Sequence, residues 1–261
     1  MKGPPVSIVI PCFNQGEFLM DAIRSVEQCD RDLHELIIVN DGSTDPSTVR
    51  LFKDLEARRY TIINQVNQGL AAARNNGIAA STGKYILPLD ADNRIRPQYI
   101  HEAARILDRY PRVGVVYGNG QYFGDKSGPW IVPAFDPLRL ILKNYIDACA
   151  VFRREIWVRC GGYDADMPFQ GFEDWNFWLD AASQGWSFFH LRKVVFDYRY
   201  RNDSMIRSVS KSAKAQCLQY LYSKHYAFIH SEIKKVATER KGLGGRMRQA
   251  FSRIWKKQLN P

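Results

Sequence analysis

Short apolar runs that alternate with helical patterns are the feature that most constrains the fold of this 261-residue chain. Residues 6–10 and 35–39 are rich in β-branched side chains, and residues 18–26 between them place apolar side chains at helical spacing. A helical pattern over residues 49–57, a strand over 60–63, a helix over 69–80 and a strand over 85–89 follow. This alternation predicts an α/β fold with a Rossmann-like, mostly parallel sheet flanked by helices.

Polar residues follow the predicted strands, at the ends where open α/β sheets bind ligands. Asn14 follows the first strand, Asp41 the second and Asn67 the third, whereas Asp90 and Asp92 follow the fourth. We expect these side chains to gather at one edge of the sheet. Two carboxylates one residue apart can hold a hard cation together with water and diphosphate oxygens. The alternative for this pair is an ordinary polar turn.

The second half of the sequence is less regular. Residues 113–117, 147–152 and 194–198 have the pattern of strands, and residues 124–137 predict a Gly/Pro-rich loop. Residues 175–182 carry apolar side chains at helical spacing and predict one more helix.

Composition narrows the class of protein. No stretch approaches the roughly 18 apolar residues that span a membrane, and residues 1–5 lack the pattern of a secretory signal, so we expect a cytoplasmic protein. Five cysteines without CxxC spacing predict free thiols, and five dispersed histidines do not favour a zinc site. From residue 234 on, nine Lys or Arg against one Glu account for +8 of the net charge of +10. A nearly neutral body argues against a nucleic-acid partner.

Four segments carry the most specific pattern, through their order and spacing. They are Val6-Ser7-Ile8-Val9-Ile10-Pro11-Cys12-Phe13-Asn14, Val39-Asn40-Asp41-Gly42-Ser43-Thr44-Asp45, Gly69-Leu70-Ala71-Ala72-Ala73-Arg74-Asn75-Asn76-Gly77 and Leu89-Asp90-Ala91-Asp92. In combination they resemble glycosyltransferase family 2, an inverting family with the GT-A fold, over roughly residues 5 to 210.

The resemblance implies a site for a nucleotide-sugar donor. Its donor-binding residues would be Pro11, Phe13, Asp41, Ser43, Gly69, Arg74, Asp90, Ala91 and Arg201. The resemblance further implies that Asp41 lies near the base, and that Asp90 and Asp92 meet Mn²⁺ or Mg²⁺ as metal ligands.

Two of these implied roles have structural alternatives. A carboxylate at Asp41 can accept the imide proton of uracil, or it can form an Asx-turn within its loop. A guanidinium at Arg74 can donate to carbonyl or phosphate oxygens. Alternatively, Arg74 is a solvated helix charge or forms a structural ion pair with an aspartate at a strand end.

Glu173 and Asp174 resemble the ED motif of the same family, at the start of a helix. There the second carboxylate takes the proton of the acceptor hydroxyl, which implies Asp174 as catalytic base and a supporting or acceptor-binding role for Glu173. Adjacent acids in a first helical turn also complement the helix dipole, which is the alternative. Phe172 and Trp175 could bind the acceptor, although most aromatic side chains at helical spacing belong to a core.

Residues 199–204 resemble the segment of this family that closes over the diphosphate. The family often has histidine where this chain has Arg201. Arginine cannot ligate a cation, but it stabilises phosphate charge. We therefore expect Arg201 to contact phosphate rather than metal.

The C-terminal residues predict a basic amphipathic helix. Met247, Ala250, Phe251, Ile254 and Trp255 follow helical spacing, with Arg248, Arg253 and Lys256 elsewhere around the helix. Such a helix can lie on an anionic membrane surface at the inner face of the cell membrane. The alternative is that its apolar stripe packs on the domain or on a partner chain.

Three regions are expected along the chain: a nucleotide-sugar donor-binding half (residues 1–105), an acceptor-binding and catalytic-base half of the same domain (106–215) and a helical basic extension (216–261). The predicted function is metal-assisted, inverting transfer from a nucleoside diphosphate sugar, UDP foremost, to a saccharide or lipid-linked saccharide. The setting would be cell-surface polysaccharide or lipopolysaccharide synthesis. Two alternatives stay open: another nucleotide-dependent α/β transferase, such as a nucleotidyltransferase, and a non-catalytic carbohydrate-binding protein of this fold.

Overall fold

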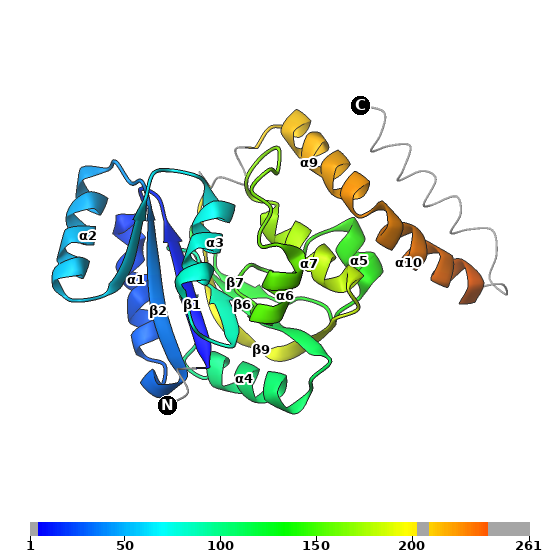
Figure 1. Cartoon of the computed structure of the whole chain (residues 1–261), viewed down its shortest axis with the longest axis horizontal. Coiled ribbons are helices and arrows are strands. Elements are labelled where there is room, and N and C mark those ends of the chain that lie inside the picture. The colour runs from blue at the N-terminus through cyan, green and yellow to red at the C-terminus, as the bar shows by residue number, and fades with distance from the viewer. Residues whose placement is uncertain (1–4, 203–208, 240–261) are drawn as a thin grey trace.

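The computed structural model describes residues 5–202 and 209–239 and shows a mixed α/β architecture (Figure 1). The first half contains β1 (Val6–Cys12), α1 (Gly16–Glu27), η1 (Arg31–Leu33), β2 (His34–Asp41), α2 (Pro46–Ala57), β3 (Thr61–Gln65), α3 (Leu70–Ala80) and β4 (Tyr85–Pro88). The second half contains β5 (Arg94–Ile95), α4 (Tyr99–Arg109), β6 (Val113–Gly124), β7 (Gly128–Trp130), α5 (Pro137–Leu142), β8 (Val151–Arg153), α6 (Arg154–Cys160), α7 (Glu173–Ser183), β9 (Ser187–Tyr200), α9 (Lys211–Lys224) and α10 (Tyr226–Glu239).

The strands form one sheet in the order β3-β2-β1-β4-β8-β6-β9-β5, and β7 pairs with β6. The longer ladders are parallel and join β1 to β2 and β4, β2 to β3, and β6 to β9. The ladders of β5, β7 and β8 are short and antiparallel. The predicted α/β class and mostly parallel sheet are confirmed, and β8 joins the two parallel parts.

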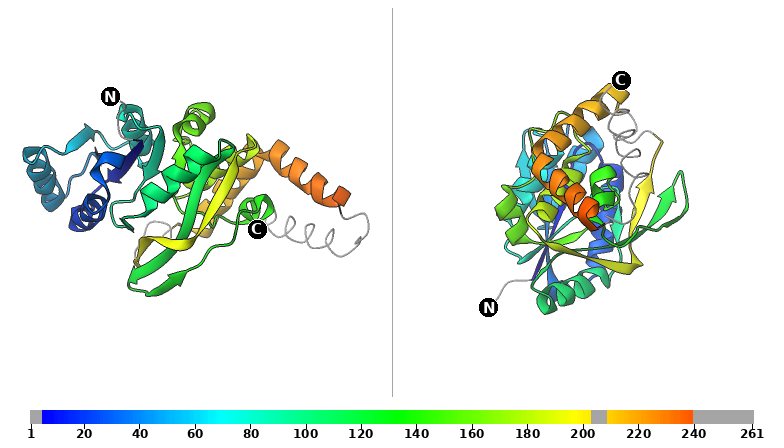
Figure 2. Two further views of the ribbon diagram at one scale, coloured as in Figure 1. Left: turned by 90° about the horizontal axis from the view of Figure 1, so that it is seen from below. Right: turned by 90° about the vertical axis from the view of Figure 1, so that its right-hand side faces the viewer.

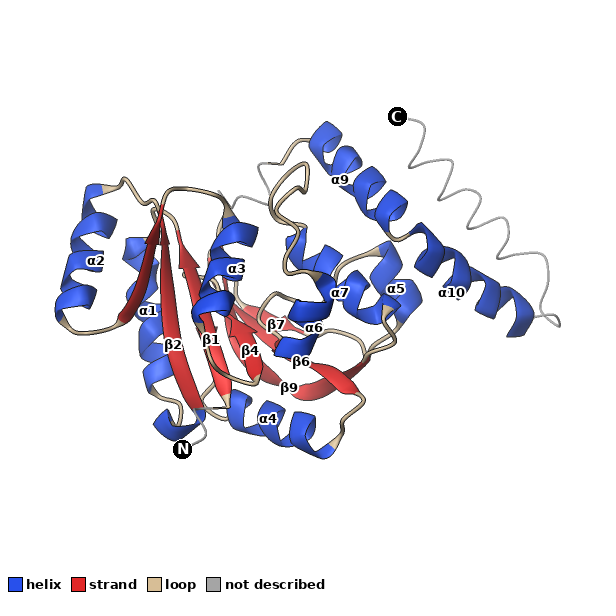
Figure 3. Ribbon diagram, in the orientation of Figure 1, coloured by secondary structure: helices blue, strands red, loops and turns tan. Residues whose placement is uncertain are grey.

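Helices cover both faces of the sheet, and each face has its own core (Figure 3). Ile8 and Ile10 of β1 pack with residues of α1, α2 and α4, whereas Val9 packs with residues of α3 on the other face. Successive side chains of a strand point to opposite faces, so a continuous apolar run indicates a strand buried on both sides. Figure 2 shows β6 and β9 side by side, with α9 and α10 in a row along the second half.

Two predictions for the second half were partly wrong. Residues 124–137 are not only a loop, because β7 forms there and pairs Trp130 with Gly120 of β6. The strand expected over residues 147–152 begins only at Val151. In both places strand pairing with residues distant in sequence decides the structure, which local patterning does not reveal.

The three-part division of the chain stays a prediction, and its boundaries at 105/106 and 215/216 fall inside α4 and α9. The amphipathic pattern of residues 247–255 lies outside the described residues. Within the described part of the chain, no helix is both long and apolar enough to cross a membrane.

A partly buried polar cluster fastens α9 to the body of the protein. The Asp164 carboxylate accepts hydrogen bonds from Tyr220 Oη at 2.9 Å and from Lys224 Nζ at 2.8 Å. His225 Nε2 lies 2.8 Å from Asn176 Oδ1 on α7, and the histidine side chain is buried. The end of α9 is therefore held through hydrogen bonds as well as apolar contacts.

We expect the protein to lose stability below about pH 6.5, because His225 is buried in its neutral form. Burial, followed by the charge of Lys224, lowers its pKa from 6.5 to about 4. Between these values the unfolded chain binds a proton that the folded chain does not, so the free energy of unfolding falls as the pH falls, by up to about 3 kcal/mol. Denaturant unfolding at pH 7.5 and 4.5 should show a smaller pH effect for His225→Gln than for the wild type. His101→Gln, at an exposed histidine, is the control, and equal pH effects in all three proteins would contradict this account.

Candidate active site

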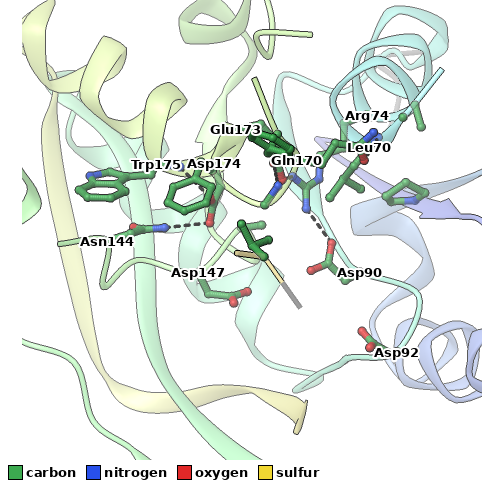
Figure 4. A pocket seen from close by; sticks show the side chains of 18 of the residues that line it. Leu70, Arg74, Asp90, Asp92, Asn144, Asp147, Gln170, Glu173, Asp174 and Trp175 are labelled. Carbon is green, nitrogen blue, oxygen red and sulfur yellow. Dashed lines mark hydrogen bonds and ion pairs between the residues drawn. The ribbon is translucent and has the colours of Figure 1, made fainter. Parts of the chain in front are cut away.

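A cavity of about 1300 Å³ lies at the carboxyl ends of β1, β2 and β4 (Figure 4). The start of α3, residues 143–148 and the start of α7 complete it. Its lining includes the predicted site residues Pro11, Phe13, Asp41, Gly69, Arg74, Asp90, Ala91, Asp92, Phe172, Glu173, Asp174, Trp175 and Arg201, but not Ser43. Small-molecule pockets usually measure roughly 300–1,000 Å³, so this cavity is larger than most.

Arg74 connects the two halves of the cavity. Its side chain is 1% exposed, and its Nη2 donates to Asp90 Oδ1 at 2.7 Å. Its Nη1 donates to Glu173 Oε1 at 2.6 Å. Among the alternatives for Arg74, these contacts match the structural ion pair with an aspartate at a strand end. A contact between Arg74 and a donor stays a prediction.

Asp90 and Asp92 form an acidic pair directly after β4. The Asp90 side chain is 30% exposed. Burial, followed by the charge of Asp90, raises the pKa of Asp92 to about 6. The turn is anchored by Arg199, whose N–H donates to Asn93 Oδ1 at 2.9 Å and whose Nε donates to the Asp92 carbonyl at 3.1 Å. Negative charge is thus concentrated in a place that water only partly screens.

The acidic pair fits a hard cation that shares its ligands with a substrate. No group of three His, Cys, Asp or Glu side chains that could hold a metal ion occurs within residues 5–202 and 209–239. Mg²⁺ often takes one or two carboxylates and completes its shell with phosphate oxygens and water. Asp90 and Asp92 offer such a partial set, and a cation would offset the repulsion that raises the pKa of Asp92.

Asp41 anchors the loop that leads into α3. Its Oδ1 accepts hydrogen bonds from Gln65 Nε2 and from the Gln68 N–H, each at 2.8 Å. Its Oδ2 accepts one from the Gly69 N–H at 3.0 Å. Gly69 has φ +88°, a backbone conformation that other residues adopt only with strain, so this position favours glycine. The Asp41 bonds reach another strand and loop rather than an Asx-turn, and its contact with a base stays a prediction.

The loops after β1 and β2 form the rim of the cavity. Phe13 is 44% exposed and lines the cavity together with Pro11. Ser43 Oγ accepts a hydrogen bond from the Asn14 N–H at 3.1 Å and thereby joins the two loops. The structure thus places Phe13 and Pro11 in the lining of the cavity and Ser43 in the support of the rim.

Asp174 lies in the first turn of α7, on the opposite side of the cavity from the acidic pair (Figure 4). Its Oδ2 accepts a hydrogen bond from Asn144 Nδ2 at 2.9 Å, and its Oδ1 accepts one from the Trp175 N–H at 2.7 Å. Burial, followed by the charge of Glu173, raises the pKa of Asp174 well above its ordinary value. A raised pKa brings a carboxylate closer to the range in which it takes up protons at neutral pH.

Glu173, Phe172 and Trp175 are buried beside Asp174. Besides its ion pair, Glu173 accepts a hydrogen bond through Oε2 from the Gly171 N–H at 2.6 Å, which agrees with a supporting role. The rings of Phe172 and Trp175 lie 6.3 Å apart, and Trp175 Nε1 donates to the Leu140 carbonyl at 2.6 Å. Both rings belong to the core and also line the cavity, so an acceptor contact stays a prediction.

Arg201 brings positive charge to the acidic pair from just beyond β9. The centre of its guanidinium lies 4.9 Å from the Phe18 ring centroid. Its charge also counteracts the burial that raises the pKa of Asp92. This is the placement expected for a side chain that stabilises a diphosphate, although the phosphate contact itself stays a prediction.

Sequence reasoning missed several polar residues of the cavity, among them Asn144, Asp147 and Gln170. Asn144 holds Asp174, and Gln170 Oε1 accepts a hydrogen bond from the Leu70 N–H at 2.9 Å. All three lie between helices and strands, where periodicity carries no information. The only available signal was the polar pair Asn144 and Asp147 at the start of the run, residues 147–152, that we interpreted as a strand.

Comparison with known proteins places the chain in a family. The model of "Glycosyl transferase family 2" matches residues 7–161. The putative glycosyltransferase EpsE of Bacillus subtilis is 26% identical over 215 residues, which cover 79% of this chain and 77% of EpsE. The putative glycosyltransferase EpsH of the same organism is 36% identical over 107 residues, which cover 40% of this chain and 31% of EpsH. The match to EpsH therefore spans about a third of that protein.

Solved structures share the fold. The structure of Staphylococcus aureus TarS residues 1–349 in complex with UDP-GlcNAc has a TM-score of 0.65 and 17% sequence identity, with 87% of this chain and 74% of that chain covered. The mannosyltransferase PcManGT of Pyrobaculum calidifontis, in complex with GDP-Man and Mn²⁺, has a TM-score of 0.58 and 19% identity, with 97% and 80% covered. These likenesses confirm the GT-A type of fold that the sequence predicted. Because the family model spans more than half of its residues, the chain belongs to glycosyl transferase family 2.

Proposed function

We propose that this chain transfers a sugar from a nucleoside diphosphate sugar, with UDP foremost, to a hydroxyl of a saccharide or lipid-linked saccharide, with inversion. One observation carries the proposal: Asp174 and the acidic pair Asp90 and Asp92 line the same cavity from opposite sides. An inverting displacement needs the leaving group and the base on opposite faces of the anomeric carbon. The UDP-GlcNAc bound by TarS and the GDP-Man bound by PcManGT support a donor of this class.

The donor half of the cavity would hold the nucleotide and its diphosphate. Phe13 offers an exposed ring to the base, while Arg201 offers a charge to the phosphates. When bound by Asp90 and Asp92, Mn²⁺ or Mg²⁺ supplies Lewis-acid neutralisation of the charge on the leaving diphosphate. The Mn²⁺ in the PcManGT complex supports this choice of cation.

Asp174 would take the proton of the attacking hydroxyl. Asn144 holds one carboxylate oxygen at 2.9 Å and so fixes the orientation of the side chain. The raised pKa improves the match between the base and neutral pH. Arg74 forms ion pairs with Asp90 and Glu173, so its role is to hold the metal-binding pair at a fixed distance from the start of α7, which carries the base.

The nature of the released product separates this reaction from its alternatives. With a sugar donor and a saccharide acceptor, we expect free nucleoside diphosphate to appear in step with the glycosylated product. Release of pyrophosphate instead would indicate a nucleotidyltransferase. Saccharide binding with no turnover of any nucleotide sugar would indicate a carbohydrate-binding protein of the same fold.

Removal of divalent cations should lower turnover by about 10²-fold or more, because neutralisation of the leaving group contributes several kcal/mol to transition-state stabilisation. The measurement is sugar transfer in EDTA, followed by addition of excess Mn²⁺ or Mg²⁺, which should restore activity. Calorimetry of Mn²⁺ and UDP with Asp92→Asn should show weakened metal binding. Full activity in the chelator would refute the metal role of Asp90 and Asp92.

We also propose that residues 247–255 attach the chain to an anionic membrane surface, where a lipid-linked acceptor for polysaccharide or lipopolysaccharide synthesis would be found. The basic amphipathic pattern of this segment supports the proposal. In flotation with phosphatidylglycerol vesicles, the full chain should float, and the double variant Phe251→Ser and Trp255→Ser should not. Equal flotation of the two proteins would discard the idea.

A further inference from the structure

Asp147 is a carboxylate of the cavity with no place in the proposed reaction so far. It lies in the segment between α5 and β8 and lines the cavity. Figure 4 shows it between Asp174 on one side and Asp90 on the other, with its carboxylate turned toward Asp90. The side chain thus faces the space between the base and the diphosphate-binding end.

The known contacts of Asp147 leave most of its hydrogen-bonding capacity unused. Its Oδ1 accepts one hydrogen bond, from the Cys149 N–H at 2.8 Å. Within residues 5–202 and 209–239, no lysine or arginine forms an ion pair with it. An ionised carboxylate has about four acceptor positions. Asp147 is half-buried, and a carboxylate that is partly removed from water without an ion-pair partner is costly and typical of functional sites.

The reaction geometry decides which part of a substrate would meet Asp147. Under the proposed function, on which this inference rests, the anomeric carbon lies between the diphosphate and the hydroxyl held by Asp174. The ring of the transferred sugar must then occupy the space that Asp147 faces. We propose that Asp147 accepts hydrogen bonds from hydroxyl groups of the transferred sugar and so helps to select the donor.

The chemistry of the site favours a neutral, hydroxyl-bearing ligand there. The Asp147 carboxylate faces Asp90, so another anion such as phosphate would meet like charge there and be repelled. A sugar presents adjacent hydroxyl donors without charge, and a carboxylate accepts from two of them at once. Among the described residues, Asp147 forms no group of three metal-binding side chains with Asp90 and Asp92.

The test compares Asp147→Asn with the wild type and with Asp54→Asn, which makes the same change on the exposed face of α2. Calorimetry in Mn²⁺ measures the affinity for UDP and GDP and for UDP-glucose, UDP-GlcNAc and GDP-mannose. In Asp147→Asn we expect the affinity for the nucleoside diphosphate to change less than about twofold. The affinity for the preferred nucleotide sugar should fall about 10- to 100-fold, the usual effect of losing a charged hydrogen bond.

Deoxy analogues of the preferred donor give a second measurement. If Asp147 had only a structural role, its replacement would not change the ratio of the affinities for the donor and for its deoxy analogue. The wild type and Asp54→Asn should bind the analogue that lacks the recognised hydroxyl about tenfold or more weakly than the full donor. Asp147→Asn should bind both nearly equally. Retained binding of UDP or GDP shows that the variant is folded, and Asp147→Ser serves as a second variant.

The outcomes separate this inference from the proposed function. Equal losses for the nucleoside diphosphate and for the nucleotide sugar would assign Asp147 to the diphosphate or to the fold and overturn the inference. Unchanged discrimination between donor and deoxy analogue would overturn it as well. If the wild type bound no nucleoside diphosphate, the proposed function itself would fail first.

Discussion

Replacement of Asp174 by asparagine should lower the turnover number of sugar transfer by about 10²–10⁴-fold, the contribution of a positioned general base. Asparagine keeps the size of the side chain and can still accept a hydrogen bond, but it cannot take a proton. Donor affinity should change little, because the nucleotide is expected at the opposite side of the cavity. Steady-state transfer rates and donor calorimetry on the same preparation measure the two effects.

The pH profile gives this prediction a second readout. Because burial and Glu173 raise the pKa of Asp174, the turnover number of the wild type should fall on the acid side well above pH 3.8, as the base becomes protonated. The residual activity of Asp174→Asn should lack this acid limb. Asp32→Asn is the matched control, because Asp32 is exposed and distant in sequence from Asp174. This variant should behave as the wild type. Unchanged turnover in Asp174→Asn would remove Asp174 from the mechanism.

Replacement of Arg74 by methionine should lower the free energy of unfolding by about 3–5 kcal/mol, the usual cost of removing one partner of a buried ion pair. Glu173 would keep a charge in a place where its side chain is 4% exposed. The loss of the ion pair costs less at Asp90, because its side chain is 30% exposed and water can reach the carboxylate. Turnover should fall as well, since the ion pairs hold the acidic pair and α7 together.

Chemical denaturation of matched variants tests the effect on stability. Arg159→Met removes an arginine whose partner is Glu155, where the two side chains are 58% and 50% exposed. Exposed pairs contribute about 0–1 kcal/mol, so this variant should unfold almost as the wild type does. Adding Glu173→Gln to Arg74→Met should recover part of the stability but none of the activity. Equal destabilisation by Arg74→Met and Arg159→Met would contradict the buried pair.

Local patterns predicted the secondary structure of the first half of the chain well. The apolar runs at residues 6–10 and 35–39 became β1 and β2, because a strand buried on both faces needs apolar side chains in both directions. The polar residues after these strands line or support one cavity, since parallel strands end at a common edge. Residue spacing was sufficient to predict a helix or strand where its structure depends on residues that are close in sequence.

The second half depended on pairing that the sequence does not display. The Gly-rich end of β6 (residues 118–124) is a strand because two other strands pair with it. One is β7, only a few residues away in sequence, and the other is β9, about 70 residues away. Asn144 and Asp147 entered the site because the segment that carries them folds against α7 and the acidic pair. Their position follows from contacts between distant segments, which no periodicity records.

Arg74 shows most clearly which properties the sequence determined and which the tertiary structure decided. The sequence by itself determined an arginine on a helix that follows a polar loop, and it allowed a ligand contact, a solvated charge or an ion pair. Only the tertiary structure showed the ion pair and excluded the solvated charge, by burying the guanidinium between Asp90 and Glu173, whereas a ligand contact stays a prediction. The physical reason is that residue type and spacing determine which element forms and which groups can ionise. The partner of a buried charge is decided by which distant carboxylates the packed elements bring within reach.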